Sequence, residues 1–134
     1  MNAKVGDSKE VTVAEDLTRT QIVQYAGASG DYNPLHSDER FAKEIAGYPS
    51  VFAHGMLTMG MTGRVLTDWF GPENILAYGV RFQAQVWPGD RLVATATVTE
   101  VRDDASGQVA DVIVSTVNQN GESVLSGTAT VRLV

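Results

Sequence analysis

The chain of 134 residues contains no cysteine and only two histidines, His36 and His54. The first absence excludes disulfides, thiolate zinc sites and cysteine nucleophiles, and the second argues against a histidine-rich metal centre. Basic residues are also scarce, with 10 Lys and Arg against 16 Asp and Glu and a net charge of −6, which argues against a nucleic-acid binder. No apolar run approaches the roughly 20 residues that span a bilayer, and residues 1–10 are too polar for a signal peptide. We therefore expect a cytoplasmic protein that neither crosses a membrane nor binds nucleic acid.

The chain does have enough apolar sequence for one hydrophobic core. Apolar residues make up 43% of it and charged residues 19%, a balance typical of globular rather than disordered chains. The length fits a single domain, so we expect residues 1–134 to fold as one. The hydrophobic period changes once along the chain, from helical in the first half to a period of two in the second.

The first half is predicted to be mostly helical after a short strand at residues 10–13. Thr18, with Gln21 three residues later, forms a capping box at the start of a helix. That helix is expected to fray in the glycine-containing stretch of residues 27–30. A short amphipathic helix is expected over residues 38–45.

The centre of the domain is predicted to be a helix over residues 55–70, which is apolar on nearly every side of a helical wheel and therefore buried. From residue 75 onward apolar and polar residues alternate. The inward positions are Val80, Phe82, Ala84 and Val86 in one strand and Leu92, Ala94, Ala96 and Val98 in the next. Turns are expected at residues 88–90 and 103–107, and a type I′ hairpin at Asn120-Gly121. Four long strands in sequence predict an antiparallel meander covered by the buried helix, an α+β fold.

One loop, residues 29–36, concentrates polar side chains with chemical potential. Asp31 and His36 are five residues apart, and Asn33-Pro34 folds the backbone between them so that both side chains can converge. A convergent carboxylate and imidazole form an acid–base pair. The alternative is a plain turn, in which Asp31 caps a neighbouring helix and Asn33-Pro34 are ordinary turn residues. A serine hydrolase is a poor fit, because Ser29 lacks the strand–elbow–helix context.

A second motif favours the functional interpretation. Residues 53–56 (AHGM) stand at the start of the predicted buried helix, where free backbone N–H groups can stabilise an oxyanion. We expect the amide of Gly55 to do this, because glycine lets a substrate oxygen approach closely. His54 is interpreted as a satisfied structural histidine rather than a catalytic one. Met56 is expected to fill the core or to line an acyl tunnel.

These motifs carry a family resemblance. Residues 25–42 (YAGASGDYNPLHSDERFA) resemble the hydratase motif of the MaoC-like, (R)-specific enoyl-CoA hydratases of the hot-dog-fold superfamily. Residues 52–56 (FAHGM) resemble that family's second signature, and residues 80–82 and 88–90 its following strand and turn. Residues 54–60 look like the catalytic (3R)-hydroxyacyl dehydratase subunits of actinobacterial type II fatty-acid synthesis.

The resemblance implies a hot-dog fold, a curled antiparallel sheet wrapped around a central helix, as one MaoC-like domain over residues 1–134. It implies reversible syn hydration of trans-2-enoyl thioesters to (3R)-3-hydroxyacyl thioesters in fatty-acid metabolism. The residues that match are the catalytic Asp31, His36 and Gly55 and the substrate-binding or orienting Ser29, Asn33, His54 and Met56. No metal and no cofactor are expected, because CoA or phosphopantetheine enters as part of the substrate.

The resemblance also implies a dimer whose sheets join edge to edge around an acyl-thioester tunnel, which would remove an exposed strand edge. A homodimer is expected, while a heterodimer with a related hot-dog chain and an acyl-carrier protein as partner stay open. Two alternative functions also stay open. One is an acyl-thioester-binding subunit that is active only in a heterodimer. The other is an acyl-CoA thioesterase, which would not need the pair of Asp31 and His36.

Overall fold

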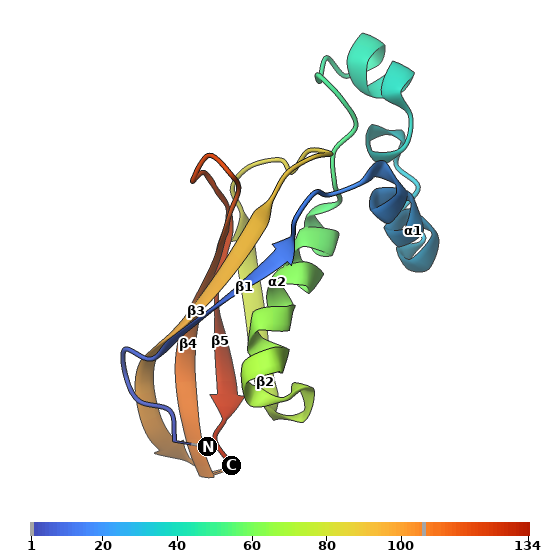
Figure 1. The fold of residues 1–134 in the computed structure, drawn as a ribbon. Helices are drawn as coiled ribbons and strands as arrows, with labels where there is room; N and C mark the ends of the chain where they lie inside the picture. Colours follow the sequence, from blue (N-terminus) through green and yellow to red (C-terminus); the bar gives the residue numbers. More distant parts are fainter. Residues whose placement is uncertain (1, 106) are drawn as a thin grey trace.

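A curled antiparallel sheet with one long helix against it forms the body of the molecule (Figure 1). The computed structural model describes residues 2–105 and 107–134, so the turn expected at residues 103–107 lies partly outside the described residues. The strands are β1 (Ser8–Ala14), β2 (Ile75–Phe82), β3 (Leu92–Asp104), β4 (Gly107–Val117) and β5 (Ser123–Arg132). Their order is β1-β3-β4-β5-β2, and every neighbouring pair is antiparallel. Across both described ranges, no helix has the length and apolar character needed to cross a membrane.

The strand order differs from the predicted meander at one edge. β3, β4 and β5 follow one another as expected, but β2 pairs with β5, and β1 takes the place beside β3. The ladder of β2 ends because two successive amides, those of Gln83 and Ala84, donate to the same carbonyl of Val124. The chain then reaches β3 through residues 83–91, which include the expected turn at residues 88–90, where the Asp90 N–H donates to Trp87 O.

The hydrophobic core lies between the sheet and α2 (Gly55–Phe70). The alternation predicted for β3 is confirmed, since its inward side chains are at most 1% exposed: Leu92, Ala94, Ala96 and Val98. The same layer contains one buried polar pair, a hydrogen bond of 2.6 Å between the hydroxyls of Thr62 and Thr116.

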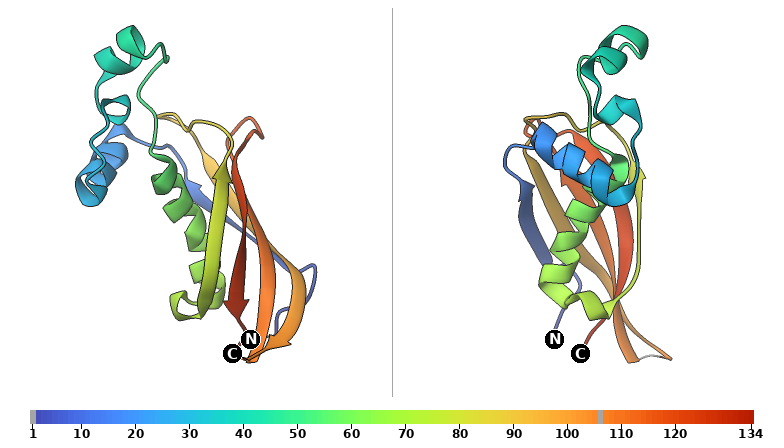
Figure 2. Two further views of the ribbon diagram at one scale, coloured as in Figure 1. Left: turned by 180° about the vertical axis from the view of Figure 1, so that it is seen from behind. Right: turned by 90° about the vertical axis from the view of Figure 1, so that its right-hand side faces the viewer.

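The helix α2 has the predicted bounds, but it is not buried on all sides. Its fully buried positions are Thr58, Thr62, Val65, Leu66 and Phe70. Met56 in the first turn is 57% exposed, so the prediction that it fills the core is wrong for the single chain. The physical reason is that the sheet curls around only one side of the helix (Figure 2).

A smaller helical segment before α2 extends beyond one end of the sheet (Figures 1 and 2). Its first helix, α1 (Arg19–Ser29), begins at the predicted capping box of Thr18 and Gln21. The predicted fraying is wrong, because Gly30 adopts the left-handed conformation (φ 76°) and its N–H satisfies the carbonyl of Ala26. A 3₁₀ turn (Pro34–His36) and a short π-helix (Phe41–Ile45) follow.

The hairpin between β4 and β5 is not of type I′. That turn needs a positive φ at Asn120, and only glycines have positive φ among the described residues. Instead, the Gly121 N–H donates to Asn118 O, and the Asn118 side chain accepts from the N–H groups of Asn120 and Glu122. The side chain of Asn118 therefore shapes a longer loop, in which Gly121 alone is left-handed.

Candidate active site

The loop after α1 is fixed by a series of hydrogen bonds from backbone to side chain. The Asp31 N–H donates to Ser29 Oγ (3.1 Å), the Asn33 N–H donates to Asp31 Oδ1 (3.2 Å), and the Leu35 N–H donates to Asn33 Oδ1 (3.0 Å). Each short polar side chain thus bonds the backbone two residues onward, as in Asx and ST turns. Asn33 also caps the 3₁₀ turn that ends at His36. Ser29 and Asn33 therefore support the backbone that carries Asp31 and His36.

His36 is held by the segment that precedes α2. Its Nδ1 lies 2.6 Å from the carbonyl oxygen of Phe52, and because a carbonyl only accepts, Nδ1 carries the hydrogen. Nε2 is then left with a lone pair. The ring of His36 also packs edge-on against the ring of Phe52, with the centroids 5.2 Å apart. His36 thus presents one basic nitrogen in a defined direction.

His54 connects the same loop to the start of α2. It is 2% exposed, and its Nε2 donates to the carbonyl oxygen of Asp31 at 3.0 Å. Its ring stacks on that of His36, with centroids 3.8 Å apart and planes 25° apart, and Tyr25 packs edge-on at 4.9 Å. Its Nδ1 is buried without a hydrogen-bond partner among the described residues. The interpretation of His54 as a satisfied structural histidine therefore holds for one of its nitrogens.

The N-terminus of α2 lies beside these residues. The His54 side chain makes no capping bond to the helix, and the first amides of a helix, here Gly55 and Met56, have no helix carbonyl to bond. A cavity of about 300 Å³ borders Gly55 and is also lined by Thr58 and Phe82. This is the geometry of an anion-stabilising site.

Phe82 is placed differently from its prediction. The alternation of β2 predicts it in the core, but it is 52% exposed because the strand ends there. The edge of its ring lies against Gly55, where an added Cβ would be 3.1 Å from the nearest ring carbons. Phe82 therefore occupies the space that a side chain at position 55 would need.

Asp31, His36 and His54 bring three donor atoms within 4.8 Å of one another. Such a set could in principle hold a metal ion, but the two imidazoles are stacked. Lone pairs of an imidazole lie in the plane of its ring, so those of two stacked rings run nearly parallel and do not converge on one ion. The arrangement fits proton transfer better than metal binding, and the absence of a metal from the reaction stays a prediction.

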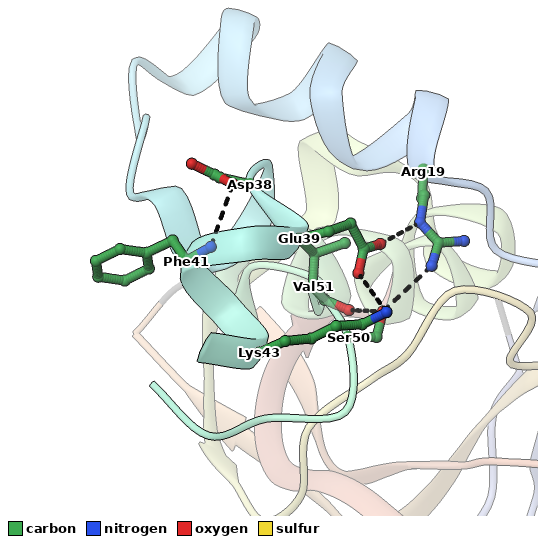
Figure 3. A network of polar contacts seen from close by, with 7 residues as sticks. All are labelled: Arg19, Asp38, Glu39, Phe41, Lys43, Ser50 and Val51. Atoms are coloured by element: carbon green, nitrogen blue, oxygen red, sulfur yellow. Dashed lines mark hydrogen bonds and ion pairs between the residues drawn. The ribbon is translucent and has the colours of Figure 1, made fainter. Parts of the chain in front are cut away.

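An ion-pair network ties the parts of this helical segment together (Figure 3). Arg19 Nε donates to Glu39 at 2.6 Å, and its guanidinium also reaches Ser50 Oγ at 3.4 Å. Lys43 pairs with the other Glu39 oxygen at 3.8 Å. The hydrogen bond from Arg19 is the largest cause that holds the pKa of Glu39 below its ordinary value. The network joins α1, the π-helix and the loop of residues 46–54 that leads to α2.

The structure does not show the helix-capping role that the plain-turn alternative gives to Asp31, although Asp31 and Asn33 both accept from backbone N–H groups two residues onward, as turn residues do. The following helical turn is capped by Asp38, whose Oδ1 accepts from the Phe41 N–H at 3.2 Å (Figure 3). Asp31 is exposed, and its carboxylate accepts a hydrogen bond within its own loop, from the Asn33 N–H. Phe52 lies in the motif of residues 52–56, but the sequence predicts no role for it, because the group that bonds His36 is a backbone carbonyl that any residue supplies.

The chain is similar to known proteins in both sequence and structure. The family model described as "MaoC like domain" matches residues 1–120. The 3-hydroxyacyl-thioester dehydratase Y of Mycobacterium tuberculosis is 43% identical over 75 residues, which cover 54% of this chain and 26% of that protein. The (R)-specific enoyl-CoA hydratase of Rhodospirillum rubrum is 34% identical over 97 residues, covering 71% of this chain and 67% of that protein. Several curated relatives are much longer than this chain. The chain covers only 26% to 40% of the length of three of them, the dehydratase Y included.

Solved structures support the same assignment. The R-hydratase PhaJ1 of Pseudomonas aeruginosa superposes with a TM-score of 0.83 at 26% identity, over 96% of this chain and 81% of that one. A chain of the ChsH1–ChsH2 complex of Mycobacterium tuberculosis gives a TM-score of 0.83 at 25% identity, over 99% and 100%. These neighbours confirm the expected hot-dog fold. The sequence motifs, the sheet around α2 and the match over residues 1–120 agree with one another. The chain therefore belongs to the MaoC-like domain family.

Proposed function

We propose that this chain catalyses the reversible addition of water to trans-2-enoyl thioesters, giving (3R)-3-hydroxyacyl thioesters. The observation that carries the proposal is the meeting of Asp31 and His36, with donor atoms within 4.8 Å, beside the uncapped start of α2 at Gly55. An acid–base pair next to a backbone oxyanion donor suits chemistry at the carbon atoms beside a carbonyl. The names of the relatives, a 3-hydroxyacyl-thioester dehydratase and an (R)-specific enoyl-CoA hydratase, support the same reaction.

Each residue has a distinct task in this reaction. His36 Nε2 takes a proton from the attacking water, whose oxygen forms the new bond to C3, because Nδ1 is already committed to Phe52. Asp31 holds that water and helps to pass the proton taken up by His36 on to C2, so that the C2=C3 double bond gains OH at C3 and H at C2 and His36 ends neutral. The N–H of Gly55 stabilises the negative charge that develops on the thioester oxygen. A proton-transfer group contributes roughly 10²–10⁴ in rate, and an oxyanion donor roughly 10²–10³.

The substrate carries its own thiol group, as CoA or as the phosphopantetheine of a carrier protein, and the reaction uses no further cofactor. The cavity of about 300 Å³ beside Gly55 provides room for the groups next to the thioester. Hydration changes no oxidation state overall, so neither a redox cofactor nor an activated phosphate is required. A cytoplasmic location stays a prediction from the sequence.

The active form is a dimer in which a second hot-dog chain covers the open side of α2. Met56 and Phe82 are 57% and 52% exposed beside the site, and large exposed apolar groups next to a site favour a partner surface. One structural neighbour, the ChsH1–ChsH2 complex, is itself an assembly of two different chains. A homodimer is the simpler proposal. Sedimentation of the purified chain tests it, because a monomer would indicate a missing partner chain.

The decisive experiment follows the loss of enoyl absorbance with trans-2-enoyl-CoAs of increasing chain length. The wild type is compared with Asp31→Asn and His36→Ala, and with Asp68→Asn as a control at an exposed position far along α2. We expect (3R) products from the wild type and the control, and losses of roughly 10²–10⁴ in both site variants. A thiol-detecting reagent in the same reaction should report no free CoA. Release of free CoA by the wild type would instead favour a thioesterase.

A further inference from the structure

We propose that His54 is a positioning residue, whose Nε2–H holds the catalytic loop against the start of α2 in the geometry that the reaction needs. The proposal deepens the proposed function and rests on it. It assigns the effect to one hydrogen-bond donor rather than to the bulk of the ring.

The first argument is the way in which the two segments of the site are joined. The Phe52 N–H donates to Leu35 O at 3.3 Å, and His36 Nδ1 donates back to Phe52 O at 2.6 Å. The bond from His54 Nε2 to Asp31 O at 3.0 Å is the cross-link at the other end of the loop. Asp31 itself is exposed, so packing does little to fix its backbone. The bonds within the loop hold its own shape, and the His54 bond fixes the backbone of Asp31 relative to the start of α2.

The second argument is the contact between the two imidazoles. The ring of His54 stacks on His36 at 3.8 Å and is itself held on another side by Tyr25 at 4.9 Å. Because His54 is 2% exposed and adjoins Gly55, it can move little. These contacts hold the ring of His54 in place, so that its Nε2–H stays directed at the carbonyl oxygen of Asp31.

The third argument separates a positioning role from simple core filling. Among the described residues, Nδ1 of His54 has no hydrogen-bond partner although it is buried. An unpartnered buried polar atom reduces stability, and an apolar ring of similar size would avoid that loss. The imidazole at position 54 therefore has a role other than filling space. The Nε2–H bond to Asp31 is the interaction that the structure offers for that role.

The test is a matched pair of substitutions at position 54. The amide nitrogen of glutamine reaches about as far as His Nε2, whereas that of asparagine reaches only as far as His Nδ1. We expect His54→Gln to keep most of the kcat for enoyl-thioester hydration. We expect His54→Asn to lose about 10²-fold in kcat, the size of effect that a misplacement near 1 Å produces, with KM little changed. Thermal unfolding of both variants shows whether they fold equally well.

Equal losses in two folded variants, or a loss seen only in KM, would overturn the proposal. A second measurement does not need activity or a variant. Imidazole ¹⁵N NMR of the wild-type protein should report His54 with its proton on Nε2, and a proton on Nδ1 instead would also overturn the proposal.

If the wild type hydrates no thioester, the proposed function fails, while hydrogen exchange still decides the role of His54. The amides of residues 31–33, 35 and 36 should exchange faster in His54→Asn than in His54→Gln.

Discussion

The carbonyl oxygen of Phe52 lies 2.6 Å from Nδ1 of His36, sixteen residues earlier in the chain. The bond determines which nitrogen of His36 carries the hydrogen and so which one can accept a proton. Two residues after Phe52, His54 bonds the backbone of Asp31, and the next residue is Gly55 at the start of α2. Residues 52–55 therefore connect His36, the loop of Asp31 and the start of α2.

The bond between His36 and Phe52 leads to a prediction about His36→Asn. The asparagine amide nitrogen occupies about the place of Nδ1 and can still donate to Phe52 O, but nothing replaces the basic Nε2. We therefore expect near-wild-type unfolding and a loss of roughly 10²–10⁴ in kcat. Chemical denaturation checks the expected stability, and initial hydration rates check the expected loss in kcat. An asparagine variant with substantial activity would show that His36 is not the base.

Gly55→Ala tests the close approach of Phe82 to the start of α2. The new Cβ would lie 3.1 Å from the ring carbons of Phe82, so the half-exposed ring must shift. We expect a loss of about 1 kcal/mol in stability, at the low end for overpacking because the ring is free to move toward solvent. We also expect a lower kcat/KM, because the new methyl group stands beside the Gly55 amide and hinders the close approach of a substrate oxygen.

The matched control is Gly27→Ala in α1, where an added Cβ meets nothing within 4 Å. Alanine is the better helix former, so this variant should gain about 0.5–1 kcal/mol. The two glycines thus have opposite expected signs in the same denaturation assay. Equal changes at both positions would mean that Phe82 does not constrain Gly55.

The network around Glu39 predicts a dependence of stability on pH. The hydrogen bond from Arg19 lowers the pKa of Glu39 from its ordinary value of 4.5. A lowered pKa in the folded state stabilises the protein above pH 4.5, and this contribution is lost as the pH falls through the folded-state pKa. Glu39→Gln should therefore be less stable than the wild type near neutral pH and equally stable in acid. The difference should not exceed about 1 kcal/mol, because the pair is partly exposed to solvent.

Glu44→Gln is the control for that prediction. Glu44 pairs with Arg40 one turn away, but the two side chains are 66% and 84% exposed. Exposed pairs contribute little, so this variant should follow the wild type more closely across the pH range. Denaturation curves at several pH values would refute the prediction if Glu39→Gln matched the wild type at neutral pH.

Much of the fold could be predicted from local patterns. The bounds of α2, the capping box at Thr18 and the inward face of β3 follow from short-range periodicity and side-chain chemistry, and all three are confirmed. The pairing of β2 with β5 rather than β3 could not be predicted, because pairing depends on how the connection of residues 83–91 crosses the sheet. One-sided burial of α2 was missed for a related reason, since apolar composition does not distinguish a helix buried by its own chain from one left open.

The candidate site was predictable in its side chains and not in its backbone. Asp31 and His36 could be paired because Asn33-Pro34 bends the chain between them, and the structure does bring them together. The contact of Phe82 with Gly55 depends on where β2 stops, and the alternation alone placed Phe82 in the core. The catalytic roles of Asp31 and His36 stay predictions until the variants are measured.

The approach of β2 to β5 gives a last prediction, on stability alone. A Cβ at Gly127 would lie 2.0 Å from Gly79 O and 2.7 Å from Val80 Cα, and both are backbone atoms that cannot move without separating the strands. A Cβ at Gly79, on the facing strand, meets nothing within 4 Å. We expect Gly127→Ala to lose about 3 kcal/mol or more, and Gly79→Ala to change stability by less than about 0.5 kcal/mol. Urea denaturation of the two variants decides it, because equal stabilities would mean that the strands do not approach as closely as the structure has them.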